Sequence, residues 1–203
     1  MTTRSLAASR SAATPPAEPG FLLTLTGGAG AGKTTLAAAL AASRDAVATL
    51  HLDDYYFTDA KHGVWRPDEN GIRRLDVGEP ESIDFTRLNA DVTSALTAST
   101  LVITEGLFAA RTEPLVPSAR FDVFVDLPAD LRLARKIHRK CVRDGFPIEV
   151  LLANYLSHRR EAHDRHIEPA RHCCDLVVDA QSPADYLAAQ IWHTINRQLV
   201  HNS

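Results

Sequence analysis

Residues 27–34 read Gly-Gly-Ala-Gly-Ala-Gly-Lys-Thr, which is a complete Gly-x-x-x-x-Gly-Lys-Thr phosphate loop. The loop follows an apolar stretch at residues 21–25 and precedes an Ala- and Leu-rich stretch at residues 36–42. A strand that runs through a glycine turn into a helix aims successive backbone N–H groups and the positive end of the helix dipole at one point. The sequence therefore predicts a polyphosphate site. Its expected contacts are Gly28, Ala29, Gly30, Ala31, Gly32, Lys33, Thr34 and Thr35.

Two side chains of this loop and one downstream acid are suited to nucleotide chemistry. Lys33 is expected to reach the β- and γ-phosphates as a point charge. The Thr34 hydroxyl is expected to ligate Mg²⁺, which prefers oxygen ligands and usually keeps several waters. Glu105 ends the apolar stretch 101–104, where an acid would meet the magnesium or its waters, although a solvated strand end is the alternative.

A pair of carboxylates, Asp53 and Asp54, follows another apolar stretch at residues 46–52. One carboxylate can help to organise the magnesium shell while the other accepts a proton from a hydroxyl group. Aspartate is also common in turns and at helix N-termini, so a structural role is the alternative. We expect Asp53, ahead of Asp54, to carry the chemistry.

A basic segment spans residues 132–143. Its cations recur at spacings of three and four, which places them on one face of a helix. They are Arg132, Arg135, Lys136, Arg139 and Arg143. Phosphoryl transfer spreads charge over the transferring oxygens, which fixed cations can stabilise. A solvated helix face is the alternative.

Residues 57–83 are polar and interrupted by Gly and Pro, and long irregular stretches in compact domains are often functional. Within or next to this stretch, Asp76 is suited to hold a diol, while Tyr55, Tyr56 and Trp65 are suited to stack on a planar ring. Surface or packing roles are the alternatives. The candidate substrate-binding residues are Asp53, Tyr55, Tyr56, Arg74, Asp76, Glu105 and His166.

Histidine and cysteine show no metal-binding pattern. We assign no catalytic role to His51, His163 or His166, although His166 is expected near the site. The odd number of cysteines, two of them adjacent, fits neither a disulfide framework nor a zinc spacing and favours reduced thiols in the cytoplasm. The cysteines are Cys141, Cys173 and Cys174.

The pattern of the chain predicts an α/β, doubly wound P-loop fold. Continuous apolar strands call for a parallel sheet covered by helices, with the ligand beyond the carboxyl ends of the strands. The expected strands are residues 21–26, 46–52, 101–104, 121–127 and 176–179. The expected helices are residues 33–43, 84–97, 129–143, 148–163 and 183–200.

The 203 residues suffice for one domain, which we place at residues 20–203 after a disordered tail at residues 1–19. A net charge of -3 gives no basic field for nucleic acid, and no apolar run is long enough for a membrane span. We therefore expect a small-molecule substrate, with homo-oligomer formation left open.

Taken together, the motifs of the chain resemble the uridine kinase and phosphoribulokinase group of P-loop kinases, over nearly everything after Gly20. Besides the phosphate loop, the matching segments are residues 51–56 (HLDDYY), 79–84 (EPESID), 102–106 (VITEG), 121–126 (FDVFVD), 132–136 (RLARK), 166–169 (HIEP) and 175–178 (DLVV). Residues 68–77 also resemble nicotinamide riboside kinases of the same superfamily.

The resemblance implies ATP- and Mg²⁺-dependent phosphoryl transfer to a hydroxyl, typically the 5′-hydroxyl of a nucleoside. It implies Asp53 as the general base, Glu105 as the acid at the strand end, Asp76 as a ribose-binding acid and Arg139 as an arginine of a lid at about residues 132–147. Lys33 and Arg139 are the other expected catalytic residues, Arg135 and Arg139 the expected nucleotide contacts outside the loop, and Thr34, Asp53 and Glu105 the expected metal contacts.

The interval between Asp53 and Glu105 has no counterpart of the segment that uridine kinases use to hold the pyrimidine. Other acceptors therefore stay open, namely nicotinamide riboside, pantothenate, a sugar or an antibiotic. A nucleotide-dependent regulatory switch is the alternative from another class, although the guanine-reading Asn-Lys-x-Asp motif is absent from the sequence.

Overall fold

The computed structural model describes residues 20–67 and 71–201, and the expected tail at residues 1–19 lies outside this part of the chain. Its centre is a five-stranded sheet in which every pairing is parallel. Across the sheet the order is β2 (Val47–His51), β5 (Leu101–Gly106), β1 (Phe21–Thr26), β6 (Arg120–Asp126) and β7 (Leu176–Asp179). The predicted α/β class with a parallel sheet is confirmed.

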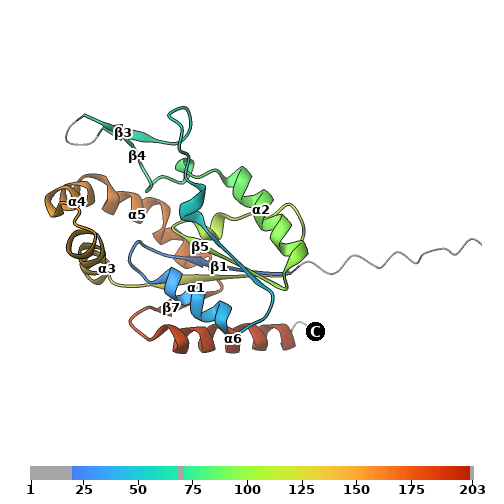
Figure 1. Ribbon diagram of the computed structural model, residues 1–203. Helices are drawn as coiled ribbons and strands as arrows, with labels where there is room; N and C mark the ends of the chain where they lie inside the picture. Colours follow the sequence, from blue (N-terminus) through green and yellow to red (C-terminus); the bar gives the residue numbers. More distant parts are fainter. Residues whose placement is uncertain (1–19, 68–70, 202–203) are drawn as a thin grey trace, which may run out of the picture.

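Helices cover both faces of this sheet, as Figure 1 shows. On one face lie α1 (Lys33–Ala42) and α6 (Ala184–His201), and on the other lies α2 (Phe85–Ala98). Successive side chains of a strand point to opposite faces, so Leu23 joins the core under α1 and α6 while Leu22 joins the core under α2. Both leucines are fully buried. The continuous apolar strands of the sequence follow from this two-sided burial.

The parallel register brings the ends of three strands to one edge of the sheet. Thr26 of β1 pairs in register with Gly106 of β5, and His51 at the end of β2 pairs with Glu105. The phosphate loop follows β1, and the 3-10 turn η1 (Leu52–Tyr55) follows β2. The candidate residues therefore meet at the carboxyl edge, where ligands of such sheets bind.

A group of helices rises beside this edge, on the left of Figure 1. It consists of α3 (Ala129–Ile137), the π-helical η4 (His138–Arg143), α4 (Ile148–Asn154), the π-helical η5 (Tyr155–Arg159) and α5 (Arg160–His166). The predicted helices at residues 129–143 and 148–163 are present, but each changes from α- to π-helical winding along its length. No residue of α3, η4 or η5 is buried.

Residues 57–83 contain a short antiparallel hairpin where the sequence suggested only irregular structure. Its strands are β3 (Trp65–Pro67) and β4 (Arg73–Leu75). The remaining short turns are η2 (Pro80–Ser82), η3 (Ala109–Arg111) and η6 (Glu168–His172). Within the described part of the chain, every helix is too short or too polar to span a membrane.

Candidate active site

The phosphate loop has the backbone conformation that its glycines permit. Gly30 and Gly32 have φ angles of 86° and 95°, in the left-handed region that side-chain-bearing residues rarely adopt. Gly32 is the N-cap of α1, and no side chain makes a capping hydrogen bond there. The first N–H groups of α1 are therefore free of a side-chain acceptor at the point where an anion would bind.

Lys33, the first residue of α1, is buried in the loop with only 8% of its surface exposed. Its Nζ donates a hydrogen bond to the Gly28 carbonyl oxygen over 3.1 Å. Burial lowers the pKa of Lys33, while the charges of Glu105 and Asp53 act in the opposite direction. A bound polyphosphate would add the negative charge that a buried ammonium group lacks.

Glu105 lies between two partners at the end of β5. Thr34 Oγ1 donates to Glu105 Oε1 over 2.8 Å, and His51 Nδ1 lies 2.8 Å from the same oxygen. The sequence predicted that Thr34 and Glu105 both contact the metal, but it did not predict the contact of His51 with Glu105. Its only sequence signal was its position at the end of β2, which pairs with β5.

Asp53 lies in η1 and lines a cavity of about 480 Å³ above the phosphate loop, whereas Asp54 does not line it. The backbone carbonyl of Asp54 instead accepts a hydrogen bond from the Arg87 side chain. The residues around the cavity come from the loop, the strand ends and the helices beside them. They are Ala29, Gly30, Gly32, Lys33, Thr34, Thr35, Asp53, Tyr56, Val77, Glu105, Gly106, Leu107, Arg135, Lys136 and Arg139.

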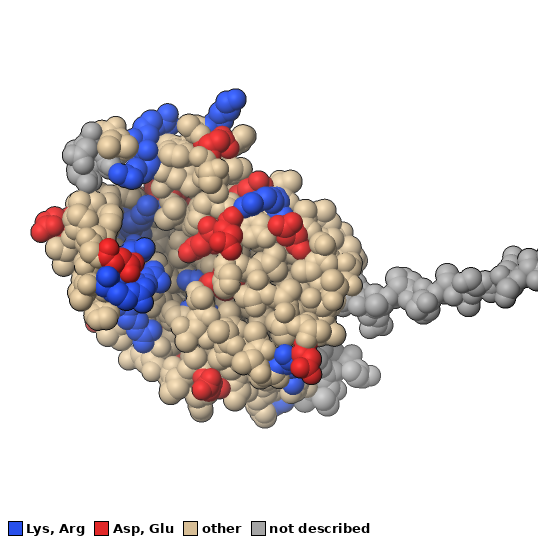
Figure 2. All heavy atoms as spheres, viewed as in Figure 1, with Lys and Arg blue, Asp and Glu red and all other residues tan. Residues whose placement is uncertain are grey.

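The basic segment divides between this cavity and other partners. Arg135, Lys136 and Arg139 line the cavity, and Figure 2 shows Lys and Arg side chains along one wall of the hollow. Arg132 does not line this cavity, and its Nε donates to the Leu127 carbonyl over 2.9 Å. Arg143, the last cation of the basic segment, pairs with its neighbour in the chain, Asp144.

The two adjacent tyrosines have different surroundings. Tyr56 lines the cavity and donates its hydroxyl to the Val77 carbonyl over 2.8 Å. Tyr55 is buried under α2, where its hydroxyl donates to Asp91 over 2.9 Å and Arg87 lies over its ring. Burial, helped by this hydrogen bond, raises the pKa of Tyr55 to about 12. Tyr55 was predicted to contact substrate, but the 3-10 turn directs its side chain into the core and it lines none of the three cavities.

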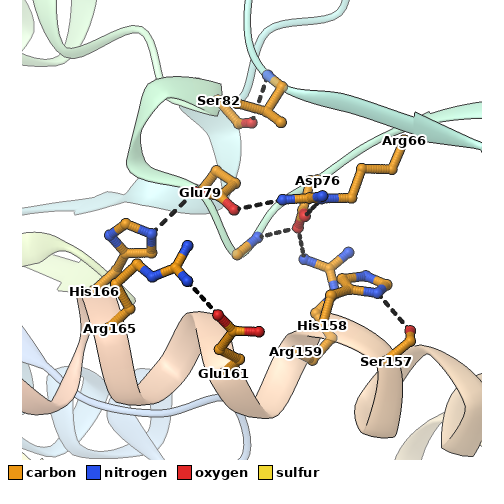
Figure 3. A network of polar contacts seen from close by, with 12 residues as sticks. Arg66, Asp76, Glu79, Ser82, Ser157, His158, Arg159, Glu161, Arg165 and His166 are labelled. Atoms are coloured by element: carbon orange, nitrogen blue, oxygen red, sulfur yellow. Dashed lines mark hydrogen bonds and ion pairs between the residues drawn. The ribbon is translucent and has the colours of Figure 1, made fainter.

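Asp76 is present near the cavity, but its carboxylate already has partners (Figure 3). Arg66 Nε and Arg159 Nη1 each lie 2.5 Å from one of its oxygens, and the Gly78 N–H donates to it over 3.0 Å. Only 2% of its surface is exposed. Burial would raise the pKa of Asp76, but Arg159, the Gly78 N–H and Arg66 hold it below the ordinary value of 3.8. Both oxygens of Asp76 therefore already accept hydrogen bonds within the protein, and the residue is almost completely shielded from solvent.

Two other predicted substrate contacts lie outside the cavity. Arg74 is an exposed residue of β4 that lines none of the cavities described here. His166 Nε2 approaches Glu79 Oε2 to 3.0 Å, and Glu79 Oε1 accepts a hydrogen bond from Arg66. The network in Figure 3 therefore ties the β3–β4 hairpin to η5 and α5 through charged groups. Arg159 lies 83 positions from Asp76, so no local pattern in the sequence indicated this contact.

Two smaller cavities adjoin the phosphate cavity. One, of about 190 Å³, shares Gly32, Thr35 and Arg135 with it and extends toward Ala180 and Leu187. The other, of about 230 Å³, shares Ala29, Val77, Leu107 and Lys136 with it. The rest of its lining comes mainly from α3, η5 and α5 and includes Arg132, Tyr155, Arg159, Arg160, His163 and Asp164. The three cavities thus form a row with the phosphate loop in the middle.

The residues around the loop suit a magnesium ion bound together with phosphates. Thr34 and Glu105 are in contact, and Asp53 lines the same cavity, so the available donors are all oxygens. In the described part of the chain no group of three or more His, Cys, Asp or Glu side chains forms a cluster that could hold a metal alone. This composition fits Mg²⁺, which is usually held by one or two protein ligands, substrate phosphates and water.

Comparisons with known proteins agree with this geometry. The model of the family described as "Phosphoribulokinase / Uridine kinase family" matches residues 69–186. A uridine kinase of Staphylococcus aureus (strain JH9) is 26% identical over 178 residues, which cover 77% of this chain and 86% of that protein.

Solved structures show the same fold at lower sequence identity. A gluconokinase from Sinorhizobium meliloti 1021 superposes with a TM-score of 0.57 at 17% identity, covering 91% of this chain and 98% of the other. A shikimate kinase from Acinetobacter baumannii, in complex with shikimate, superposes with a TM-score of 0.53 at 18% identity, covering 90% and 96%. These two similarities concern the fold alone.

Proposed function

We propose that this chain, which belongs to the phosphoribulokinase and uridine kinase family, transfers the γ-phosphoryl group of ATP to a hydroxyl group of a small metabolite. The observation that supports this most strongly is that one cavity is lined by Lys33, Thr34, Asp53 and Glu105. A phosphate cradle, an oxygen-rich metal site and an unpaired carboxylate are the parts that such a transfer needs.

In the proposed reaction Asp53 takes the proton of the acceptor hydroxyl. The acceptor oxygen then forms its bond to the γ-phosphorus as the bond from that phosphorus to the β–γ bridging oxygen breaks, and ADP leaves with the bonding electrons. Lys33 would stay in contact with the β- and γ-phosphate oxygens throughout. Magnesium, when bound between Thr34 and the phosphates, would offset their negative charge.

Each part of the reactants can be assigned to one of the three adjoining cavities. We assign the base of the nucleotide to the cavity near Ala180 and Leu187, where Arg135 Nη2 donates to the Ala180 carbonyl over 3.4 Å and offers a flat face for stacking. The phosphates occupy the central cavity. The acceptor then occupies the cavity on the opposite side, with its hydroxyl directed toward Asp53.

The helices beside the cavity would act as the lid, which the sequence placed at about residues 132–147. Arg135, Lys136 and Arg139 line the phosphate cavity from this segment, so nucleotide binding would draw it inward. Closure excludes water, which would otherwise accept the phosphoryl group in place of the metabolite. We assign Arg139 to the transferring phosphate because its side chain lines the same cavity as Lys33.

A nucleoside 5′-hydroxyl is the first acceptor to test, given the similarity to a uridine kinase. Nicotinamide riboside and sugars are further hydroxylated candidates. An acceptor without a ribose diol, such as pantothenate or an antibiotic, is favoured by one observation. The acid that would hold a ribose diol, Asp76, is already paired with two arginines. A regulatory switch is less well supported, because a switch has no need of a general base beside an acceptor cavity.

We further propose that the protein works in the cytoplasm, where ATP is available and thiols stay reduced. All three cysteines, Cys141, Cys173 and Cys174, are free thiols in the structure.

The adjacent aspartates provide a matched test. Asp53→Asn keeps the size of the side chain and removes the base, so we expect acceptor-dependent ADP release to fall about 100-fold or more while ATP binding is retained. Asp54→Asn removes the same charge one residue away, outside the cavity, and should stay within a few-fold of wild type. Normal turnover of Asp53→Asn would remove the proposed base.

A further inference from the structure

We infer that the phosphoryl acceptor carries a negatively charged group, a carboxylate or a phosphate, which binds in the 230 Å³ cavity between α3 and α5. This inference rests on the proposed kinase activity and names the class of metabolite that the acceptor side selects. It is carried by the charges that line this cavity and by the partners those charges have, or lack, within the protein.

The lining of this cavity is strongly cationic. It contains four Lys and Arg side chains and a single acid, Asp164. The four cations are Arg132, Lys136, Arg159 and Arg160. One of them, Arg159, is neutralised by Asp76 at its Nη1. With Arg159 neutralised, the lining still contains three cations and one acid, so an excess of positive charge remains.

Three of these cations have no acidic partner among the described residues, and one of the three, Arg132, bonds to the Leu127 carbonyl and to His163 instead. Lys136 makes no ion pair or hydrogen bond there, although it borders both the acceptor cavity and the phosphate cavity. Burial, followed by the charges of Arg159, Arg139 and Lys140, lowers the pKa of Lys136. Arg160, the first residue of α5, also has no partner within the described ranges, although it is exposed to solvent. A half-buried ammonium group surrounded by other cations lacks the counter-charge that a bound anion would supply.

The nucleotide does not account for all of these cations. Arg159 and Arg160 are absent from the lining of the phosphate cavity, which already has Lys33, Arg135 and Arg139 for the triphosphate. Only Lys136 is shared, at the boundary where the acceptor hydroxyl would meet the γ-phosphate. The remaining positive charge thus faces the acceptor.

The same region offers little to a neutral sugar. A carboxylate is the usual partner for a diol, but both oxygens of Asp76 accept hydrogen bonds from arginines and the residue is almost fully buried. The single acid of the lining, Asp164, is exposed to solvent and is outnumbered by the four cations. His163 adds no charge to the cavity at neutral pH, because burial, followed by Arg132, lowers its pKa. Apolar residues such as Leu133, Tyr155 and Ile167 complete the lining. Together these groups would hold a small anion with a short carbon skeleton, since the cavity is smaller than typical drug-sized sites.

Pairs of hydroxyl compounds that differ in one charged group provide the test. Suitable pairs are uridine and orotidine, pantothenol and pantothenate, glycerol and glycerate, and ribose and ribose 5-phosphate. Each compound is incubated with the full-length protein and Mg-ATP, and the gain of one phosphoryl group is followed by mass spectrometry. The carboxylate and phosphate pairs distinguish the two kinds of anion.

We expect at least one charged member to exceed its neutral partner in kcat/KM by about tenfold or more, which is what one charge-assisted contact provides. Arg160→Gln should reduce that preference by about tenfold, mainly through the KM of the acceptor. The matched control is Arg165→Gln, which loses an exposed arginine from the same helix outside the cavity and should keep the preference.

Equal or better turnover of every neutral member would overturn the inference, as would a preference that Arg160→Gln leaves intact. If no compound of either kind is phosphorylated, the proposed kinase activity fails on its own. Calorimetric binding of the same pairs to the ATP-free protein then decides the inference. Binding of a charged member that depends on Arg160 upholds it, and binding of neutral members alone overturns it.

Discussion

The two ends of the candidate site are built in different ways. The phosphate end lies on β1, α1 and β5, whose core residues, such as Leu25 and Ile103, are fully buried. The acceptor end lies on α3, η5 and α5 and on the segment around Asp76, and it is held largely by ion pairs. Neither α3 nor η5 buries a single residue.

We therefore expect the phosphate end to be rigid and the acceptor end to be adaptable. A phosphate cradle needs fixed N–H groups and a fixed ammonium group, which a packed core supplies. A lid that closes on a nucleotide and an acceptor needs low local stability, and few buried contacts give it that. The chemistry that all members of such a family share can therefore stay constant while the charge of the lid is changed to suit another acceptor.

The largest effect is expected when the positive charge of Lys33 is removed from the rigid phosphate end. Lys33→Met keeps a long side chain in the buried loop but removes the ammonium group, and we expect kcat to fall about 1000-fold. Because methionine suits the buried position, the thermal unfolding midpoint should change little. Steady-state kinetics with a saturating acceptor and a melting curve measure both effects. Activity within tenfold of wild type would show that the loop is not the catalytic end.

A smaller effect is expected from breaking the ion network of the acceptor end. Asp76→Asn leaves Arg66 and Arg159 without their shared counter-charge, and the free energy of unfolding should fall by about 1–3 kcal/mol, because Arg66 is half exposed and partly screened. Hydrogen exchange should quicken in the β3–β4 hairpin and α5 while β1 and β5 stay protected. Uniform loss of protection would contradict the proposed independence of the two ends.

The same network sets a pH dependence whose sign follows from Asp76. Its pKa is held below 3.8 in the folded protein, so its contribution to stability is present above that pH and is lost as the pH falls through the folded-state pKa. Urea denaturation of wild type and Asp76→Asn should therefore differ at neutral pH and converge below about pH 3.8. A difference that persists in acid would assign the effect to packing instead.

The smallest effects are expected when the hydroxyl group of Tyr55 or Tyr56 is removed, and the two variants should differ in which property changes. Tyr55→Phe loses a hydrogen bond to Asp91 in the core, so we expect about 1 kcal/mol less stability and kinetics within two- to threefold of wild type. Tyr56→Phe loses a hydrogen bond to Val77 at the cavity and should raise the KM of the acceptor more than it changes stability. The reverse pattern would place Tyr55 in the site.

The sequence predicted the rigid end better than the adaptable one. The loop between Phe21–Thr26 and Lys33–Ala42 was predicted almost residue for residue, because glycine positions, apolar strands and an Ala-rich helix are local signals. Asp53 and Glu105 line one cavity, and their proximity was predictable because the carboxyl ends of parallel strands must meet at one edge. Their chemical roles stay predictions.

The ion network could not be predicted in this way. Asp76 and Arg159 are separated by 83 positions, and their contact depends on how η5 and α5 pack against the hairpin. The hairpin itself has strands of only three residues, too short for a periodic pattern. Tyr55 and Tyr56 are identical neighbours, so only the turn of η1 decides which one faces the core.

The most direct test is a crystal structure of the protein with Mg²⁺ and a non-hydrolysable ATP analogue. We expect the terminal phosphate to contact Lys33, the metal to contact Thr34, and the Asp53 carboxylate to face the terminal phosphorus across a space that holds a hydroxyl group. An Asp53 carboxylate directed away from that phosphorus, with no room beside it for an alcohol, would contradict the proposed reaction.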